Sequence, residues 1–232
     1  MTAGTAAAPA RTPAEGGERV RVGLMLALTF STGVIDATGY LGLDRVFTGN
    51  MTGNVVILGM GLLRVDGLPV IGPLVALGGY VVGAMVAGRT LRTAAPGWTH
   101  RTTGVFTAVG IVLAAVAVAA VPLSGAHVAE FAQWTITGAL GAAMGAQAAA
   151  ARHLAVKDVT TVVVTSTLTG LAADSWLGAR LGQPWVRRVL AVALIGAGAL
   201  VGAACVHVNL AIGPALAAVL TLTAAAFGHR RA

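Results

Sequence analysis

Residues 36–59 read DATGYLGLDRVFTGNMTGNVVILG and come directly after an apolar run of the chain. This segment carries Asp36, Asn50 and Asn54 together with threonines and glycines, at a position that its apolar neighbours put at membrane depth. Hydrocarbon offers no hydrogen-bond partners, so polar side chains and free peptide groups there must find partners in protein or water. The segment is therefore expected to face the protein interior or a polar cavity.

The composition of the whole chain indicates a polytopic membrane protein. Apolar residues make up 56% of the 232 residues and charged residues 10%. Several windows of about 20 residues lack any formal charge, as transmembrane helices do. The net charge of +7 does not indicate nucleic-acid binding, because the arginines lie in short groups between apolar runs. The lipid bilayer is the predicted partner, and no nucleic-acid partner is expected.

Eight hydrophobic segments follow residues 1–21, a polar tail that is predicted to be disordered and cytoplasmic. Two of the segments are unusual. Threonines, asparagines and glycines fill the first half of the second segment, and threonines with a serine take the same part in the sixth. In the second segment the purely apolar part is about half of the roughly 20 residues that a crossing needs. The second and sixth segments are therefore predicted to be broken or re-entrant helices. In chain order the segments cover residues 22–43, 46–63, 68–88, 103–123, 128–151, 159–178, 189–208 and 210–228.

The positive residues discriminate between two topologies, because cytoplasmic loops gather Lys and Arg. If all eight segments crossed with the N-terminus inside, the basic residues of 89–101 and 152–157 would lie outside. If the second and sixth segments enter and leave on one side, every positive residue except Arg45 and Arg64 lies on the cytoplasmic side. The sequence thus predicts about six transmembrane helices, two broken helices and both termini in the cytoplasm.

The order of segments repeats within a single membrane domain, residues 22–228: a span, a polar half-segment and two further spans. A shift of 113 residues aligns threonines of the two polar segments. Each half, 22–123 and 128–228, holds three crossings, so the two halves are predicted to lie in opposite orientations. Inverted-topology repeats with interrupted helices at matching positions point to a solute pathway near the membrane midplane.

Asp36 is an acidic residue well inside an apolar span, where a carboxylate is costly unless it is protonated, paired or hydrated. One interpretation makes it a proton or cation relay, or a contact for a cationic or polar solute. The other makes it an acceptor for backbone N–H groups freed where the second segment breaks, which would stabilise that fold. The residue types alone leave both interpretations open.

The predicted substrate-binding residues come from both broken segments and the spans before them. Amide and hydroxyl groups can replace part of the hydration shell of a solute. Gln147 precedes Thr165 by about as much as Asp36 precedes Thr52, although helix packing also explains a glutamine there. No nucleophile elbow, phosphate loop or zinc motif occurs, so no enzyme activity, cofactor or metal is expected. The predicted site comprises Asp36, Asn50, Thr52, Asn54, Gln147, Thr161, Thr165 and Thr167.

Two strings resemble the YoaK-like family of bacterial transmembrane proteins, whose defining domain has no assigned function. They are residues 33–59, with the motifs Ile35-Asp36-Ala37, Val46-Phe47 and Met51-Thr52-Gly53-Asn54, and residues 141–174. The second half of the family often reads Gln-Asn-Ala, whereas Ala148 follows Gln147 here. The resemblance implies about six crossings of the bacterial inner (plasma) membrane and supplies no substrate.

Two functional hypotheses follow. The first is a small-solute transporter or channel for a small polar solute or protons, with a central polar site at the two broken helices. The alternative is a non-transporting membrane scaffold or subunit of a complex. They differ in whether the polar segments line a water-accessible cavity, and both are compatible with a homo-oligomer.

Overall fold

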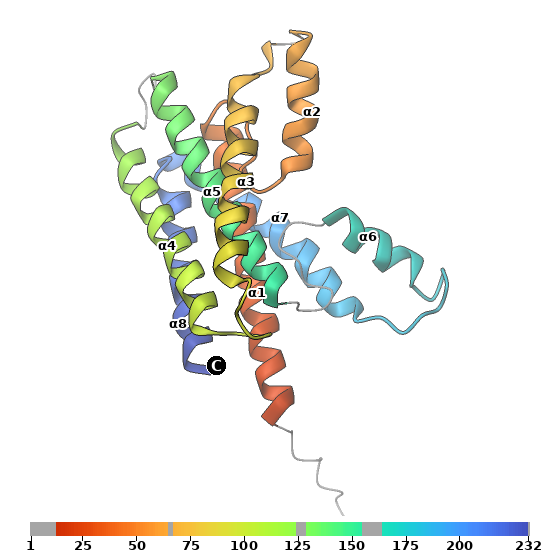
Figure 1. Ribbon diagram of the computed structural model, residues 1–232. Helices are drawn as coiled ribbons and strands as arrows, with labels where there is room; N and C mark the ends of the chain where they lie inside the picture. Colours follow the sequence, from red (N-terminus) through yellow and green to blue (C-terminus); the bar gives the residue numbers. More distant parts are fainter. Residues whose placement is uncertain (1–12, 65–66, 124–128, 155–163, 232) are drawn as a thin grey trace, which may run out of the picture.

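The computed structural model describes residues 13–64, 67–123, 129–154 and 164–231, which form helices joined by turns, with no strand among them (Figure 1). Each predicted hydrophobic segment corresponds to one α-helix. The helices are α1 (Pro13–Gly42), α2 (Met51–Leu62), α3 (Ile71–Leu91), α4 (His100–Ala120), a 3₁₀ turn η2 (Val121–Leu123), α5 (Glu130–Leu154), α6 (Val164–Ala173), α7 (Trp185–Val208) and α8 (Ile212–Arg231).

Five helices, α1, α3, α4, α7 and α8, are long and apolar enough to cross a bilayer. Helix α5 has 25 residues and runs along the same bundle, while Glu130, Gln133 and Gln147 lower its hydropathy (Figure 1). With 12 and 10 residues, α2 and α6 are shorter than the roughly 20 residues of a crossing. The chain is an all-α polytopic membrane protein, as predicted.

The start of α1 differs from the sequence expectation, which put a disordered tail over residues 1–21. The helix begins at Pro13, so residues 13–21 are helical, whereas residues 1–12 lie outside the described part. Proline suits the first position of a helix, and extending an existing helix is much easier than starting one. Glu18 also forms an ion pair with Arg187 of α7 at 2.8 Å.

The long helices pack in three main pairs: α3 on α5, α1 on α7 and α4 on α8. Helix α8 also contacts α1, and α4 also contacts α5. Two clusters of buried apolar side chains fill the bundle, one around Leu113 and Leu140 and the other around Met25 and Phe106. The short helices lie outside these pairs, with α2 against α3 and α6 against α7.

Glycines allow the two closest helix pairs to approach. A Cβ at Gly83 of α3 would collide with the backbone of Ala142 in α5, and one at Gly145 of α5 would collide with the Tyr80 carbonyl. In the other pair, a Cβ at Gly198 of α7 would collide with the carbonyl of Phe30 in α1. Small residues at such crossings let helix backbones meet, which provides much of the packing energy inside a membrane.

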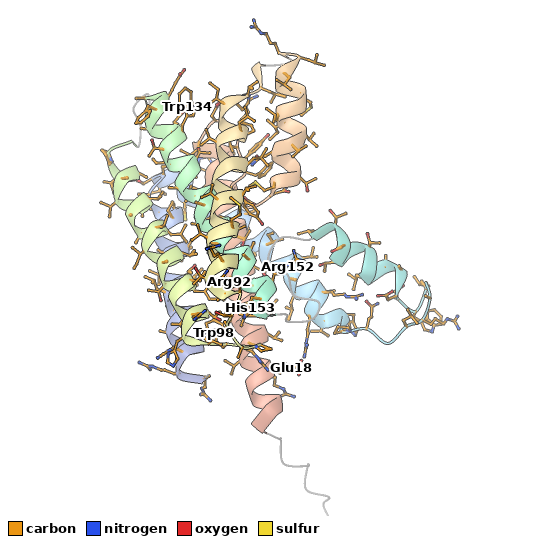
Figure 2. The ribbon with its side chains drawn as sticks, in the orientation of Figure 1. Glu18, Arg92, Trp98, Trp134, Arg152 and His153 are labelled. Carbon is orange, nitrogen blue, oxygen red and sulfur yellow. The ribbon has the colours of Figure 1, made fainter. Side chains whose placement is uncertain are left out.

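The two ends of the bundle differ in their polar residues. Arg92, Trp98, Arg152 and His153 lie toward one end, and Trp134 lies toward the other (Figure 2). The ring of His153 is 3.3 Å from the carbonyl oxygen of Ala95, which links the end of α5 to the turn between α3 and α4.

Candidate functional site

After α1 the chain turns back into the bundle before α2 begins. Asp44 and Arg45 adopt left-handed backbone angles, with φ of 54° and 55°. Residues 46–50 are not helical and run back along α1, where a Cβ at Gly39 would come within 2.6 Å of the Val46 carbonyl oxygen. The absence of a side chain at Gly39 therefore lets the returning segment lie directly on α1.

Asp36 provides the partner for the peptide groups of this returning segment. Its Oδ1 accepts hydrogen bonds from the backbone N–H groups of Thr48 at 3.0 Å, Gly49 at 2.6 Å and Asn50 at 3.3 Å. Asn50 in turn caps α2, because its side chain accepts from the Gly53 N–H. The carboxylate thus lies at the positive end of the α2 dipole and satisfies amides that lipid could not.

The second carboxylate oxygen of Asp36 is placed differently from the first. Among the described residues, no hydrogen bond reaches Oδ2, and the residue stays 9% exposed at the wall of a cavity. Oδ1 of Asp36 therefore stabilises the returning segment, as the structural interpretation expects. Oδ2 remains available to a group that enters the cavity.

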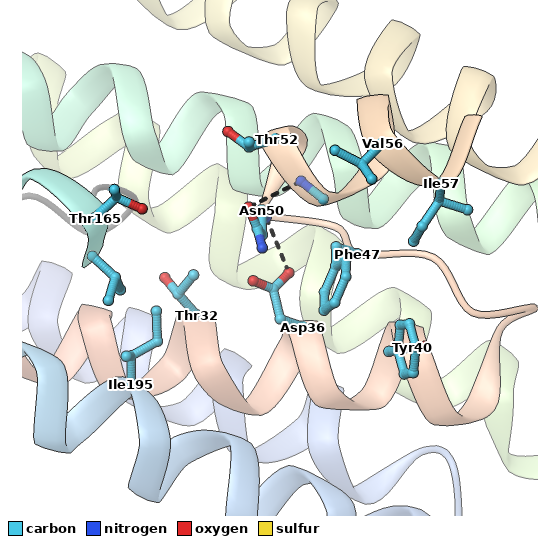
Figure 3. A pocket seen from close by; sticks show the side chains of 12 residues that line it. Thr32, Asp36, Tyr40, Phe47, Asn50, Thr52, Val56, Ile57, Thr165 and Ile195 are labelled. Atoms are coloured by element: carbon cyan, nitrogen blue, oxygen red, sulfur yellow. Dashed lines mark hydrogen bonds between the residues drawn. The ribbon is translucent and has the colours of Figure 1, made fainter. Parts of the chain in front are cut away.

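The cavity measures about 580 Å³ and is bounded by α1, the returning segment, α2, α6 and α7 (Figure 3). One carboxylate, one amide and three hydroxyl groups of threonines share the lining with aromatic and aliphatic side chains. No group of three or more His, Cys, Asp or Glu side chains comes together in the described part of the chain. The lining residues are Thr32, Asp36, Tyr40, Phe47, Asn50, Thr52, Gly53, Val56, Ile57, Val164, Thr165 and Ile195.

Half of the predicted site residues line this cavity. The structure brings together Asp36, Asn50 and Thr52 from the first half of the chain and Thr165 from the second. Thr167 lies one half-turn further along α6 and is not part of the lining. Thr161 lies outside the described residues.

Asn54 is buried behind the cavity wall rather than in it. Its side chain is 0% exposed and binds both backbone polar groups of one residue: its Nδ2 donates to the Phe47 carbonyl at 2.6 Å, and its Oδ1 accepts from the Phe47 N–H at 2.9 Å. Both hydrogen-bonding functions of the amide are thus committed to the returning segment. Asn54 stabilises the site and does not line it.

We expect Asn54→Ala to lower the free energy of unfolding by about 2 kcal/mol, because it leaves the two Phe47 backbone groups without partners. For a chain of this size that corresponds to a fall of roughly 4–8 °C in the unfolding temperature of the purified protein. Thr52→Ala is the matched control on the same helix, because Thr52 is exposed. This control should change the unfolding temperature little. Equal shifts for the two variants would contradict the role assigned to Asn54.

Gln147 reaches the cavity only through Thr32. Its side chain is 0% exposed, and its Nε2 donates to Thr32 Oγ1 at 3.2 Å and to the Leu28 carbonyl at 3.5 Å. Its Oε1 has no hydrogen-bond partner in the described part of the chain. The amide therefore supports the cavity wall from behind, across the α1–α5 contact.

Sequence reasoning missed several lining residues. Thr32 and Tyr40 lie four residues before and after Asp36, so helical spacing would have put all three on one face of α1. Phe47 stacks on Tyr40 with ring centroids 4.9 Å apart. Nothing in the local pattern of α7 signals Ile195, because only the packing of α7 on α1 brings it to the cavity.

The fold and the cavity define an all-α polytopic membrane protein with a polar, carboxylate-bearing cavity at the start of a short helix, α2. Comparison with known families agrees with this class, since residues 24–227 match the family described as "Protein of unknown function (DUF1275)". The chain belongs to that family, which confirms the resemblance found in its sequence.

The chain is also similar to the UPF0700 transmembrane protein YoaK of Bacillus subtilis (strain 168). The two are 30% identical over 157 residues, which cover 65% of this chain. The chain matches 65% of the length of that relative. No solved structure matches the fold.

Proposed function

We propose that this protein is a transporter or channel for a small polar solute or for protons, with its site in the cavity beside Asp36. The observation that carries the proposal is a carboxylate inside a membrane-spanning helix whose Oδ2 is left over at the wall of a cavity of about 580 Å³. Ionisable side chains at membrane depth are rare and usually mark ion, proton or solute pathways.

The lining suits a small solute with a cationic or hydrogen-bonding group. The Asp36 carboxylate offers negative charge, and Thr32, Thr52 and Thr165 offer hydroxyl groups that can replace water around a solute. The stacked rings of Tyr40 and Phe47 add an apolar wall with electron-rich faces. The proposal assigns no catalytic step to this lining.

An inverted-repeat arrangement supports a pathway through the same point. Under the proposed two-fold relation, α1, α2, α3 and α4 correspond to α5, α6, α7 and α8. The observed pairs α1 with α7, α1 with α8 and α2 with α3 then correspond to the observed pairs α5 with α3, α5 with α4 and α6 with α7. Transporters built in this way hold their solute where the interrupted helices of the two halves meet.

The glycines support the same correspondence. In α3, Gly79 and Gly83 contact the backbone of α5. In α7, Gly198 and Gly202 contact the backbone of α1 in the same way. Each pair has the same four-residue spacing and faces the first helix of the other half.

For orientation, we propose the bacterial inner membrane with both termini in the cytoplasm. Arg92 and Arg152 lie toward the end of the bundle at which α8 ends (Figures 1 and 2). That end would be cytoplasmic under the tendency of Lys and Arg to stay inside.

Cysteine labelling tests the proposal without knowledge of the solute. In a Cys205→Ala background, Thr52→Cys and Thr165→Cys are both expected to react with a membrane-impermeant maleimide, because a thiol ionises and reacts only where water reaches it. Ala150→Cys is the matched control, since Ala150 is 0% exposed in the bundle and should stay unlabelled. Failure of both cavity positions to label would overturn the transport proposal.

One observation favours the second candidate, a scaffold or subunit of a larger complex. Helix α6 has no buried residue and stands away from the main bundle, in contact with α7 (Figure 1). A helix with so little packing of its own suits a contact with another protein or a second copy of this chain. Absence of labelling at Thr52 and Thr165 would favour this candidate.

A further inference from the structure

A second cavity, of about 230 Å³, lies where the first turns of α1 meet the last turn of α8, separate from the cavity at Asp36. We infer that this crevice binds the phosphate group of an anionic phospholipid. It is lined by Gly17, Val20, Arg21, Leu24, Trp98, Gly228 and Arg231, which we call the basic crevice.

Two guanidinium groups, those of Arg21 and Arg231, share the basic crevice. Among the described residues, no carboxylate lies within ion-pair distance of Arg21 or Arg231. Glu18, one turn from Arg21, pairs with Arg187 at 2.8 Å. Like charges in one crevice repel each other, so an anion between them would relieve the repulsion. The guanidinium fork matches the geometry of phosphate oxygens.

The dipole of α8 opposes this effect but is the smaller term. The carbonyl end of a helix carries about half a negative charge, whereas Arg21 and Arg231 supply two full positive charges. Arg230 in the same last turn adds a third. The net local charge therefore favours an anion.

Trp98 forms a firmly held wall of the crevice. Its indole lies directly on α8, where a Cβ at Gly228 would collide with the ring. The ring stacks on Phe106 with centroids 5.3 Å apart, and its Nε1 donates to Thr103 Oγ1 at 2.9 Å. Tryptophans held in this way favour the headgroup layer of a membrane.

Arg21 is held close to the same wall. Its Nη1 lies 3.3 Å from the position that a Cβ would take at Gly97, in the turn just before Trp98. The guanidinium therefore lies beside the indole, at the boundary where a basic pocket between helices can take a phosphate headgroup.

The apolar part of the lining favours a lipid over a free phosphate ion. A free ion would use only the arginines, whereas Val20, Leu24 and the face of Trp98 offer contacts to glycerol and acyl carbons. These apolar side chains lie next to the arginines, just as the glycerol and acyl carbons of a phospholipid lie next to its phosphate.

The test measures the unfolding temperature of the purified full-length protein in a neutral detergent, with phosphatidylglycerol, phosphatidylcholine or inorganic phosphate added at equal concentration. Phosphatidylglycerol is expected to raise it by about 5 °C, because a ligand stabilises the folded state that binds it. Phosphatidylcholine and inorganic phosphate are expected to produce little change.

The double variant Arg21→Gln, Arg231→Gln is expected to lose this shift. Arg89→Gln with Arg92→Gln is the matched control, because it removes the same charge from exposed residues outside the crevice, and should keep the shift. Val20→Trp fills the crevice while both arginines remain, and should lose the shift as well. If the double arginine variant does not fold, Val20→Trp still carries the test.

Three outcomes would overturn the inference. Equal stabilisation by phosphatidylcholine would show that no anionic group is recognised. Equal stabilisation by inorganic phosphate would point to a free anion instead of a lipid. Equal loss of the shift in the Arg89 and Arg92 control would show that the overall charge of this end, and not the crevice, attracts the lipid.

Discussion

Asp36→Ala is expected to lower the unfolding temperature of the purified protein by roughly 10 °C, the largest effect of any single side chain in the site. The reason is the set of three backbone N–H groups, at Thr48, Gly49 and Asn50, that donate to Asp36 Oδ1. Without an acceptor, each buried amide costs about 1–3 kcal/mol. Removing the carboxylate also removes the cost of burying its charge, which offsets part of this loss. The net loss in the free energy of unfolding is about 3 kcal/mol.

Asp36→Asn separates the structural role from the functional one. The asparagine keeps a carbonyl oxygen for the three amides but carries no charge. The unfolding temperature of the variant is therefore expected to stay within about 3 °C of that of the wild type. The missing charge is expected to abolish coupled uptake in proteoliposomes. It should also abolish thermal stabilisation by whichever cationic or polar solute stabilises the wild-type protein in a screen.

The two variants together decide between the interpretations of Asp36 that its sequence leaves open. If Asp36→Asn unfolds as readily as Asp36→Ala, the charge itself stabilises the fold and the transport role loses its support. If Asp36→Ala is as stable as the wild type, the amides have other partners and the assigned structural role is wrong.

Gly83→Ala is expected to destabilise the protein by at least about 2 kcal/mol, because the added methyl group meets backbone and not a movable side chain. Three backbone atoms of Ala142 lie around the position of the new Cβ. Relief would require α3 and α5 to separate along the closest contact in the bundle. The measurement is the unfolding temperature in detergent, with the yield of folded protein as a second readout.

Gly78→Ala is the matched control, because a Cβ at Gly78 on the same helix meets nothing within 4 Å. Alanine favours a helix over glycine by up to about 1 kcal/mol, so this control is expected to be neutral or slightly stabilising. The same contrast applies to α7, where Gly202 is crowded and Gly196 is open. Losses of similar size for Gly83→Ala and for Gly202→Ala, its counterpart in the second half, would support the inverted repeat, and a loss in only one half would count against it.

The site shows which functional residues a local pattern can reveal. Asp36 and Thr52 are recognisable because a charge or a cluster of polar residues at membrane depth is unusual in any apolar chain. Asn54 has the same signature in the sequence, yet it binds the backbone N–H and carbonyl of Phe47 and lies behind the wall of the cavity. A polar side chain at this depth must satisfy a hydrogen bond, but the sequence does not show whether its partner is the backbone or a solute.

The sequence by itself determined the class of the protein, the approximate position of each helix and the two interrupted segments. These follow from the length of the apolar runs and from the cost of polar groups in hydrocarbon, which act locally along the chain. Only the tertiary structure decided that Ile195 reaches the cavity beside Asp36, and that Arg21 and Arg231 share a crevice with Trp98. The physical reason is that these residues meet through helix packing over large sequence distances, where glycine-to-backbone contacts determine which faces come together.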